Sequence, residues 1–235
     1  MLAIFKRELR AYFITPIGYV FTAVFLLSSG ILFGGLILQN SATFDMSYYF
    51  LGLMLAFIVV IPLLTMRLLS EERKTKTEQM ILTAPISLIG MVMAKDLAAF
   101  VLFLATMLLS CFNFIPLFMY SVPNPAILYG NMLAILLAGA AFIAIGLFIS
   151  AMTENQLASA IITIVVIAFL ILSGAFAGYV NSDIIRFVII FTSIFYRYQP
   201  FTYGMFDVTS LLYYISLVII FLFLTVRVYE MRRWQ

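Results

Sequence analysis

Six apolar stretches along the chain are each long enough to cross a lipid bilayer. A membrane-spanning helix needs about 20 mostly apolar residues, because each residue adds only about 1.5 Å to its length. The stretches are residues 17–38, 48–66, 97–119, 127–151, 157–177 and 211–228. They are continuous rather than alternating, which favours helices over the strands of a membrane β-barrel. The pattern therefore predicts an all-α integral membrane protein with six transmembrane helices.

Two shorter segments flank this pattern. In residues 1–15 the apolar side chains fall on one helical face and the basic side chains on another. This arrangement predicts an N-terminal amphipathic helix in the membrane interface, although a simple positive anchor explains the charges equally well. Residues 178–209 contain the apolar run 184–195, which is too short to span. They predict a short re-entrant or interfacial helical segment before the last span.

The longest polar segment between two spans is the loop of residues 67–96. Thr75 and Glu78 have the T-x-x-E spacing of a capping box, and a short apolar run follows before Pro85. These signals predict a short helix over residues 76–83. A mixed-charge helix held between two spans suits a docking element, whereas a solvated loop with an incidental cap is the simpler interpretation of this segment alone.

The distribution of charge predicts the orientation. Hydrophobic residues make up 65% of the chain and charged residues 10%, and the mean hydropathy of +1.17 exceeds that of soluble domains. With a cytoplasmic N-terminus, 11 of the 13 Lys and Arg residues fall inside, and only Arg186 and Arg197 fall outside. This bias predicts that both termini are cytoplasmic. The pI of about 9.0 then reflects topology and contact with membrane lipids, not nucleic-acid binding.

The six stretches lack the chemistry of a self-energised carrier or an enzyme. Ion-coupled carriers place ionisable residues within the membrane, but this chain has no His, and no charged residue lies deep inside a stretch. The acidic residues nearest the stretches are Asp45, Asp96, Glu154, Asp183 and Asp207. No G-x-x-x-x-G-K-[ST] phosphate loop occurs, and the single cysteine forms no metal cluster. We therefore expect no catalytic residue, metal or cofactor in this chain, and a secondary transporter is the weaker interpretation.

Four stretches, taken in order, resemble ABC-2 type permeases. Residues 70–87 resemble the pattern E-E-x-x-T-G-T-x-E-x-L-x-T-x-P-x-S. Residues 6–20 are similar to the K-E-L-x-x-x-F-x-S-P-I-A/G-Y-V opening of the GldF-like branch, which includes a permease associated with gliding motility. Residues 142–156 resemble A-I-G-x-F-x-S-x-x-T-x-N-Q, and residues 204–213 fit G-x-x-D-x-x-x-L-(I/L)-Y. The resemblance covers nearly the whole chain.

This resemblance implies a single ABC-2 type transmembrane domain over residues 1–235 in the cell (inner) membrane. Such a permease forms a homodimer, or pairs with a related permease, on a separate ABC ATPase subunit that binds ATP and Mg²⁺. The direction of transport implied by the family is export. The alternative is a membrane component of a motility or envelope complex, in which ATP-driven conformational change does mechanical work without moving a substrate.

The resemblance also implies which residues act. The predicted loop helix would be the coupling helix, seated in a groove of the ATPase. Its coupling residues would be Glu71, Glu72, Thr75, Thr77, Glu78, Gln79, Leu82 and Pro85. Lys76 stands where the family usually has Gly, which predicts an earlier helix start, and Gln79 stands where it usually has Glu.

At the outer face, the resemblance implies that residues 178–209 cap the exit. Arg197, Gly204 and Asp207 would form an extracellular gate. A purely structural pair between Arg197 and Asp207 is the alternative interpretation.

Overall fold

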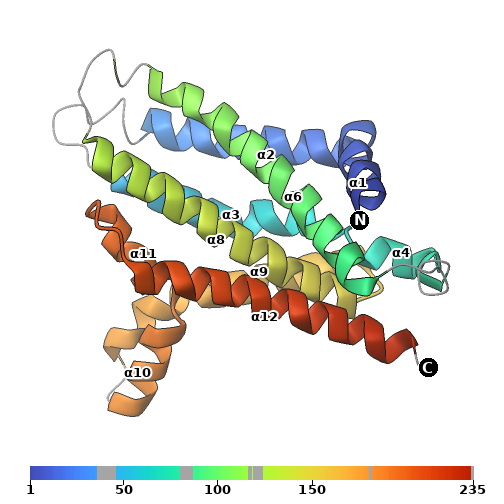
Figure 1. The fold of residues 1–235 in the computed structure, drawn as a ribbon. Coiled ribbons are helices and arrows are strands. Elements are labelled where there is room, and N and C mark those ends of the chain that lie inside the picture. The colour runs from blue at the N-terminus through green and yellow to red at the C-terminus, as the bar shows by residue number, and fades with distance from the viewer. Residues whose placement is uncertain (36–45, 80–86, 116–117, 119–123, 180–181, 234–235) are drawn as a thin grey trace.

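The described part of the chain is a bundle of long helices with shorter helices at its two ends. A computed structural model describes residues 1–35, 46–79, 87–115, 118, 124–179 and 182–233. Six helices in this part are long and apolar enough to span a membrane, which confirms the predicted fold class. The long helices run side by side, so the short elements gather at opposite ends (Figure 1).

The long helices begin and end close to the predicted positions, with one exception. Their bounds are α2 Pro16–Phe33, α3 Ser47–Thr65, α6 Leu88–Ser110, α8 Pro125–Met152, α9 Gln156–Phe176 and α12 Val208–Arg233. The exception is α6, which begins at Leu88 and ends at Ser110, whereas the predicted span runs from residue 97 to residue 119. Ser87 caps this earlier start, because its side-chain oxygen accepts a hydrogen bond from the Gly90 amide at 3.3 Å. Residues 88–96 therefore belong to a helix and not to the loop.

Asparagine side chains fix the starts of two further long helices. Asn124 accepts a hydrogen bond from the amide of Ala126 at 3.0 Å, and Pro125 occupies the first turn of α8. Asn155 accepts one from the amide of Leu157 at 3.0 Å at the start of α9. Each cap satisfies an amide that the first helical turn leaves without a backbone partner, so both boundaries follow from local sequence.

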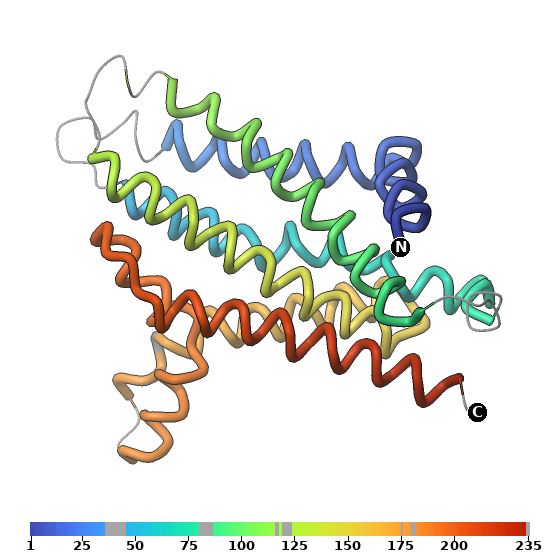
Figure 2. The backbone as a smooth tube through the Cα atoms, in the orientation of Figure 1, coloured from blue at the N-terminus to red at the C-terminus, as the bar shows by residue number. Residues whose placement is uncertain are grey.

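The N-terminal segment forms the predicted amphipathic helix, α1 Leu2–Ile14. Thr15 is extended (φ −89°, ψ 152°) because the following Pro16 disfavours helical geometry, and the chain turns sharply into α2. Gly18 makes this turn possible, since a Cβ atom there would overlap the Tyr12 carbonyl oxygen. Figure 2 shows α1 at a steep angle to α2, across the end of the bundle.

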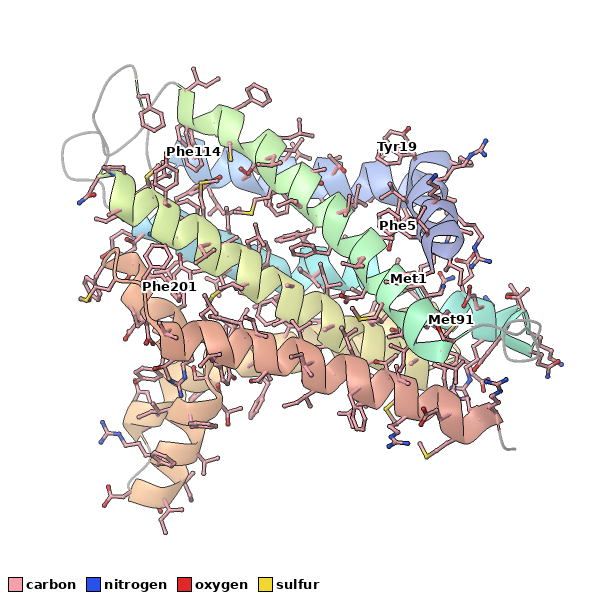
Figure 3. All side chains as sticks on the ribbon, in the orientation of Figure 1. Met1, Phe5, Tyr19, Met91, Phe114 and Phe201 are labelled. Carbon is pink, nitrogen blue, oxygen red and sulfur yellow. The ribbon has the colours of Figure 1, made fainter. Side chains whose placement is uncertain are left out.

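One side of α1 packs on α6. Ile4 and Phe5 lie against the core and Tyr12 is buried, and a Cβ at Gly90 of α6 would lie 3.8 Å from the Met1 side chain. Figure 3 labels Met1 and Phe5 on α1 and Met91 on α6. The helix is therefore attached to the protein along one face, in addition to any contact with lipid.

The segment before the last span is a helical pair, as predicted. It consists of α10 Asp183–Thr192 and α11 Ile194–Thr202, which meet at the extended residue Ser193. The two differ in their surroundings: α11 buries Ile194, Tyr198 and Phe201 against α8 and α9, whereas α10 has no buried residue and points away from the long helices (Figure 1).

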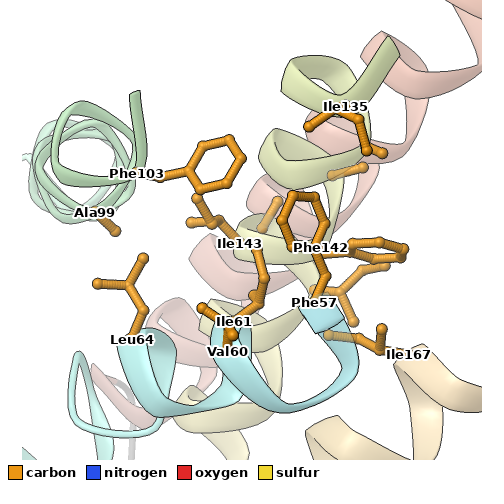
Figure 4. Packing of buried hydrophobic residues seen from close by; sticks show 14 of the residues in the cluster. Phe57, Val60, Ile61, Leu64, Ala99, Phe103, Ile135, Phe142, Ile143 and Ile167 are labelled. Carbon is orange, nitrogen blue, oxygen red and sulfur yellow. The ribbon is translucent and has the colours of Figure 1, made fainter. Parts of the chain in front are cut away.

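Helix α8 forms the centre of the bundle and contacts α3, α6, α9, α11 and α12. Figure 4 shows Phe142 and Ile143 of α8 among apolar side chains of the neighbouring helices, including Phe57 and Phe103. Glycines on α8 permit this closeness: a Cβ at Gly139 would overlap the Phe103 ring, and a Cβ at Gly146 would overlap Thr65. Small residues therefore bring α3 and α6 onto α8, as is usual between membrane helices.

Candidate functional site

One end of the bundle carries most of the charge. It comprises α1, the short helix α4 (Ser70–Lys74), the start of α6, the α8–α9 turn and the last turns of α12 (Figure 1). We call it the basic end, after the Lys and Arg residues predicted to lie there. These are Lys6, Arg7, Arg10, Arg67, Arg73, Lys74, Lys76, Lys95, Arg227, Arg232 and Arg233.

A group of four charged residues, here called the Lys95 network, joins α1, α4 and α6. Lys95 Nζ lies 2.9 Å from Glu72 Oε1 and 3.3 Å from Glu8 Oε1, and it donates to the Leu68 carbonyl at 2.8 Å. Arg7 Nη2 lies 2.6 Å from Glu8 Oε1 and 3.0 Å from Glu72 Oε1. Two cations and two carboxylates therefore balance at the junction of three helices.

The Lys95 network is largely shielded from solvent. The Lys95 side chain is 1% exposed and that of Glu72 is 14% exposed. Burial raises the pKa of Glu8, but the charges and hydrogen bonds of Lys95 and Arg7 outweigh it, and the net pKa lies below the ordinary value. The carboxylate therefore stays ionised at neutral pH. An open hollow of about 460 Å³, lined by these residues with Tyr12 and Arg67, lies beside the network.

A second group, here called the Arg232 cluster, ties the loop to α8 and α12. Arg232 lies 2.9 Å from Glu78 Oε1 and donates to the Ala151 carbonyl at 2.6 Å. Arg73 donates to the Met152 carbonyl at 2.8 Å and lies 2.8 Å from Glu154. The C-terminal turns of α12 are thus attached both to the loop and to the end of α8.

Hydrogen bonds to a serine of α8 hold the start of α4. Ser150 Oγ accepts from the Leu69 amide at 3.1 Å and the Ser70 amide at 3.0 Å, and it donates to the Met66 carbonyl at 3.3 Å. The α3–α4 junction therefore rests on α8 through backbone groups. Thr65 also packs on Gly146, so the C-terminal end of α3 has little room to move relative to α8.

Among the described residues of the loop, the accessible ones lie between or next to these attachments. Lys74, Thr75, Lys76, Thr77 and Gln79 are exposed, whereas Glu78 is buried. We call residues 74–79 the loop tip.

The helix predicted over residues 76–83 is wrong at its start. Lys76 has φ = +57° and lies with Thr77 in a turn, and helical structure resumes only at Glu78. Thr75 does not cap it forward, because its hydroxyl donates back to the Glu71 carbonyl at 2.8 Å. The backbone at Lys76 thus keeps a conformation that favours Gly, so the expected earlier helix start is also wrong. Residues 80–83, Leu82 among them, and Pro85 lie outside the described residues.

The predicted coupling residues fall into two groups in the structure. Thr75, Thr77 and Gln79 lie at the exposed loop tip. Glu72, which is largely shielded from solvent, and Glu78, which is buried, form ion pairs within the chain, and Glu71 pairs with Arg67 one helical turn away. The carboxylates of Glu72 and Glu78 thus hold the loop in place.

The partners of these carboxylates were not predicted from the sequence. Lys95 and Asp96 were expected in the loop before the third span, but both lie within α6, near its start, and are buried. A signal was present: Leu88, Met91, Lys95 and Ala98 share one face of α6, so Lys95 interrupts an apolar stripe at helical spacing. A lysine in that position predicts a buried anionic partner.

The three predicted gate residues lie at the opposite end and do not form one site. The Arg197 guanidinium stacks over the rings of Phe191 (5.3 Å) and Tyr213 (5.4 Å). Asp207 caps α12, accepting from the amides of Thr209 (3.0 Å) and Ser210 (3.1 Å). No ion pair joins Arg197 to Asp207 in the part of the chain that is described, so the paired interpretation is wrong.

The local backbone explains why glycine occupies position 204. Its φ of +71° suits glycine, and a Cβ there would lie 3.2 Å from the backbone of Ala126 at the start of α8. It therefore lets the α11–α12 connection approach α8 closely.

The comparisons with known proteins agree with this architecture. A family model described as ABC-2 family transporter protein matches residues 36–229, which include α3, the loop and nearly all of α12. No curated protein matches the chain. The six apolar helices and a match over most of the chain lead to one conclusion: the chain belongs to the ABC-2 transporter family and is a membrane-spanning transporter component.

Proposed function

We propose that the chain is the permease subunit of an ABC exporter and is energised by a separate ATPase that docks on the loop tip. The basic end is cytoplasmic in this proposal, in keeping with the positive-inside bias. One observation carries it: the exposed loop tip lies between the Lys95 network and the Arg232 cluster. Ion pairs therefore connect the loop tip to several helices, and a force applied to the loop tip is passed on to them.

The two groups of ion pairs transmit movement in different directions. Glu72, on the N-terminal side of the loop tip, connects it through Lys95 to α6 and through Arg7 to α1. Glu78, on the C-terminal side, connects it through Arg232 to α12. Closure of an ATPase against residues 74–79 therefore rotates the inner ends of α3 and α6 and pulls on α12. The chain supplies mechanical coupling and no hydrolytic chemistry.

In this proposal the predicted coupling residues have two roles. Thr75, Thr77 and Gln79, with the basic Lys74 and Lys76, contact the ATPase. Glu72 and Glu78 position the loop from within. ATP and Mg²⁺ are bound by the partner, and a second copy of this chain or a related permease completes the transport path. Assignment to the GldF-like branch is supported by the resemblance of residues 6–20 to the opening of that branch.

At the opposite end, α10 and α11 cap the exit of the path. Arg197 is held between Phe191 and Tyr213, so it joins α10 to the start of α12. A movement of α12 at the basic end would therefore reach α10 through a single long helix. This connection supports a gating role for Arg197, while Gly204 and Asp207 fix the geometry of the turn.

Co-purification from native membranes tests the proposal. The tagged full-length chain is captured from a mild detergent extract, and the co-eluting proteins are identified by mass spectrometry. We expect an ABC ATPase with the wild type and its loss from the double variant Lys74→Glu, Lys76→Glu. The matched control is Lys6→Glu, Arg186→Glu, which reverses two exposed charges outside the loop tip. The proposal fails if the wild type retains no ATPase.

The recovered complex also separates transport from purely mechanical work. A transported substrate stimulates ATP hydrolysis by the reconstituted complex, so a screen of membrane-extract fractions should yield a stimulating fraction. Stimulation only by another envelope protein would instead favour the motility or envelope alternative.

A further inference from the structure

Helix α1 has three distinct faces, although an amphipathic helix needs only two. At 3.6 residues per turn, Ile4, Glu8 and Tyr12 fall on the face that packs on α6 and the Lys95 network. A second face carries Leu2, Leu9 and Phe13, and Leu2 and Phe13 are 67% and 54% exposed. The third face carries Lys6, Arg7 and Arg10.

On the third face, Arg7 pairs with Glu8 and Glu72, but the other two cations lack such partners in the described part of the chain. Among the described residues, neither Lys6 nor Arg10 takes part in an ion pair. Both are exposed, and together with Arg7 they line an open hollow of about 580 Å³ along the side of α1. Most other cations of the basic end are neutralised, Arg67, Arg73, Lys95 and Arg232 among them. This hollow is thus a concentrated site of uncompensated positive charge.

We propose that the basic face of α1 binds the phosphate of an anionic phospholipid, and that Arg7 transmits its occupancy to the coupling loop. The ligand class follows from the two exposed faces together. Lys and Arg attract a phosphate headgroup, while Leu2, Leu9 and Phe13 on the adjoining face suit acyl chains. A free phosphate would use only the first of these faces. The family match begins at residue 36, so it assigns no role to α1.

Arg7 can bind the carboxylates of the Lys95 network and a lipid phosphate at the same time. Its bonds to Glu8 (2.6 Å) and Glu72 (3.0 Å) both use Nη2, and its side chain is 57% exposed. The planar guanidinium has five N–H donors in a fixed fork, so Nε and Nη1 are left for a phosphate oxygen. A bound headgroup therefore immobilises Arg7 without removing it from the carboxylates, and it strengthens the attachment of α4 to α1.

The binding step is tested on the chain alone. Delipidated full-length protein is titrated with phosphatidylglycerol or with phosphatidylcholine of the same acyl chains, and bound lipid is counted by native mass spectrometry. Each basic residue contributes about fivefold to attraction of an anionic lipid. We therefore expect Lys6→Gln, Arg10→Gln to weaken phosphatidylglycerol binding at least tenfold. The control Lys74→Gln, Lys76→Gln removes two exposed charges from the loop tip and should change it less than twofold.

Two results would overturn the binding step. One is equal affinity for the two lipids. The other is displacement of phosphatidylglycerol by millimolar inorganic phosphate, which would show a free-anion site instead of a lipid site. Since Lys6 and Arg10 are exposed, their replacement should leave the melting temperature unchanged, and this is measured on the same samples.

The transmission step is tested by hydrogen exchange in nanodiscs. Phosphatidylglycerol at 30% in phosphatidylcholine should slow amide exchange in residues 70–77 at least threefold relative to phosphatidylcholine alone. Arg7→Lys keeps the charge but loses the fork, so it should bind phosphatidylglycerol within about twofold of wild type and lose this protection. Unchanged protection in Arg7→Lys, or faster exchange in the anionic nanodisc, would overturn the role of Arg7. Neither test uses an ATPase, so both are independent of the proposed function.

Discussion

The Lys95 ammonium on α6 lies 2.9 Å from the Glu72 carboxylate on α4; the Lys95 side chain is buried and that of Glu72 is largely shielded from solvent. This pair links the third spanning helix directly to the loop that precedes it. The same carboxylate oxygen also receives Arg7 from α1 at 3.0 Å. A single oxygen atom thus connects three helices at the basic end, and disturbance of either partner should affect all three.

Removal of both members of this pair should destabilise the protein by less than the two single removals added together. Lys95→Met leaves two carboxylates in a poorly solvated site, and Glu72→Gln leaves the ammonium with one partner fewer. Breaking a buried pair costs about 3–5 kcal/mol, whereas replacement of both charges is often much cheaper. We expect each single variant to lower the melting temperature strongly, and the double variant to lower it by less than the sum. Additive shifts in a double-mutant cycle would contradict this coupling.

The Lys95 network should also make α1 sensitive to acid. The pKa of Glu8 is lower in the fold than its ordinary value of 4.5, because Lys95 and Arg7 outweigh the effect of burial. The ionised group therefore stabilises the fold above pH 4.5, and this contribution is lost as the pH falls through the lower folded pKa. We expect hydrogen exchange in residues 2–14, corrected for intrinsic rates, to rise below pH 4.5 in the wild type.

The variant Glu8→Gln serves as the reference for this measurement. It lacks the titrating group, so its corrected exchange in α1 should be faster at pH 7 and should change less between pH 7 and pH 4. An identical pH profile in both proteins would show that another carboxylate is responsible.

Lys76 should tolerate glycine better than its neighbour does. Its φ of +57° costs a lysine about 1–2 kcal/mol, which glycine avoids, although glycine loses more chain entropy on folding. Lys74 is helical in α4, where glycine costs about 1 kcal/mol. We expect Lys76→Gly to melt at or above the wild-type temperature and Lys74→Gly to melt below it. Hydrogen exchange in residues 70–79 provides a second measurement and should be faster in Lys74→Gly than in Lys76→Gly. If Lys76→Gly is instead the less stable variant, the turn at Lys76 is ruled out.

Lys76 also illustrates which features sequence could predict. The family pattern has Gly at this position, and Lys76 adopts a positive φ, which is the backbone conformation that favours Gly. Helix propensity pointed the other way because it describes an average residue, whereas the anchors at Glu72 and Glu78 impose the local backbone here. The six spans were predictable for the opposite reason: lipid imposes one requirement on each, which long apolar runs satisfy by themselves.

The partners in the long-range ion pairs could not be predicted from the sequence. Glu8 contacts Lys95 only because the Thr15–Pro16 turn folds α1 across the end of α6. The charge of Lys95 lowered the local hydropathy and made residues 88–96 resemble a loop. In the same way, Asp207 was predicted to pair with Arg197, but a cap within its own turn satisfies it first. Local caps are visible in sequence, and partners from distant segments are not.

The cap formed by Asp207 should be measurable at the start of α12. Its carboxylate accepts from two amides and from the Ser210 hydroxyl at 2.6 Å, and these hydrogen bonds hold the pKa of Asp207 below its ordinary value. Asp207→Ala should cost ~1 kcal/mol and speed exchange in residues 208–212. Asp183→Ala in the first turn of α10 is the matched control, since no capping hydrogen bond starts that helix. Equal effects of both changes on α12 would rule out the cap.

Two glycine-to-alanine changes should have opposite effects on stability. At Gly146 a Cβ would overlap Thr65 of α3, and overpacking of this kind costs about 1–3 kcal/mol. At Gly30, inside α2, no atom lies within 4 Å of the added Cβ, so alanine should stabilise the helix by roughly 0.5–1 kcal/mol. Melting temperatures of the two variants in the same detergent test this directly. Because helix propensity favours alanine at both positions, a loss of stability confined to Gly146→Ala would identify contact between α3 and α8 as the cause.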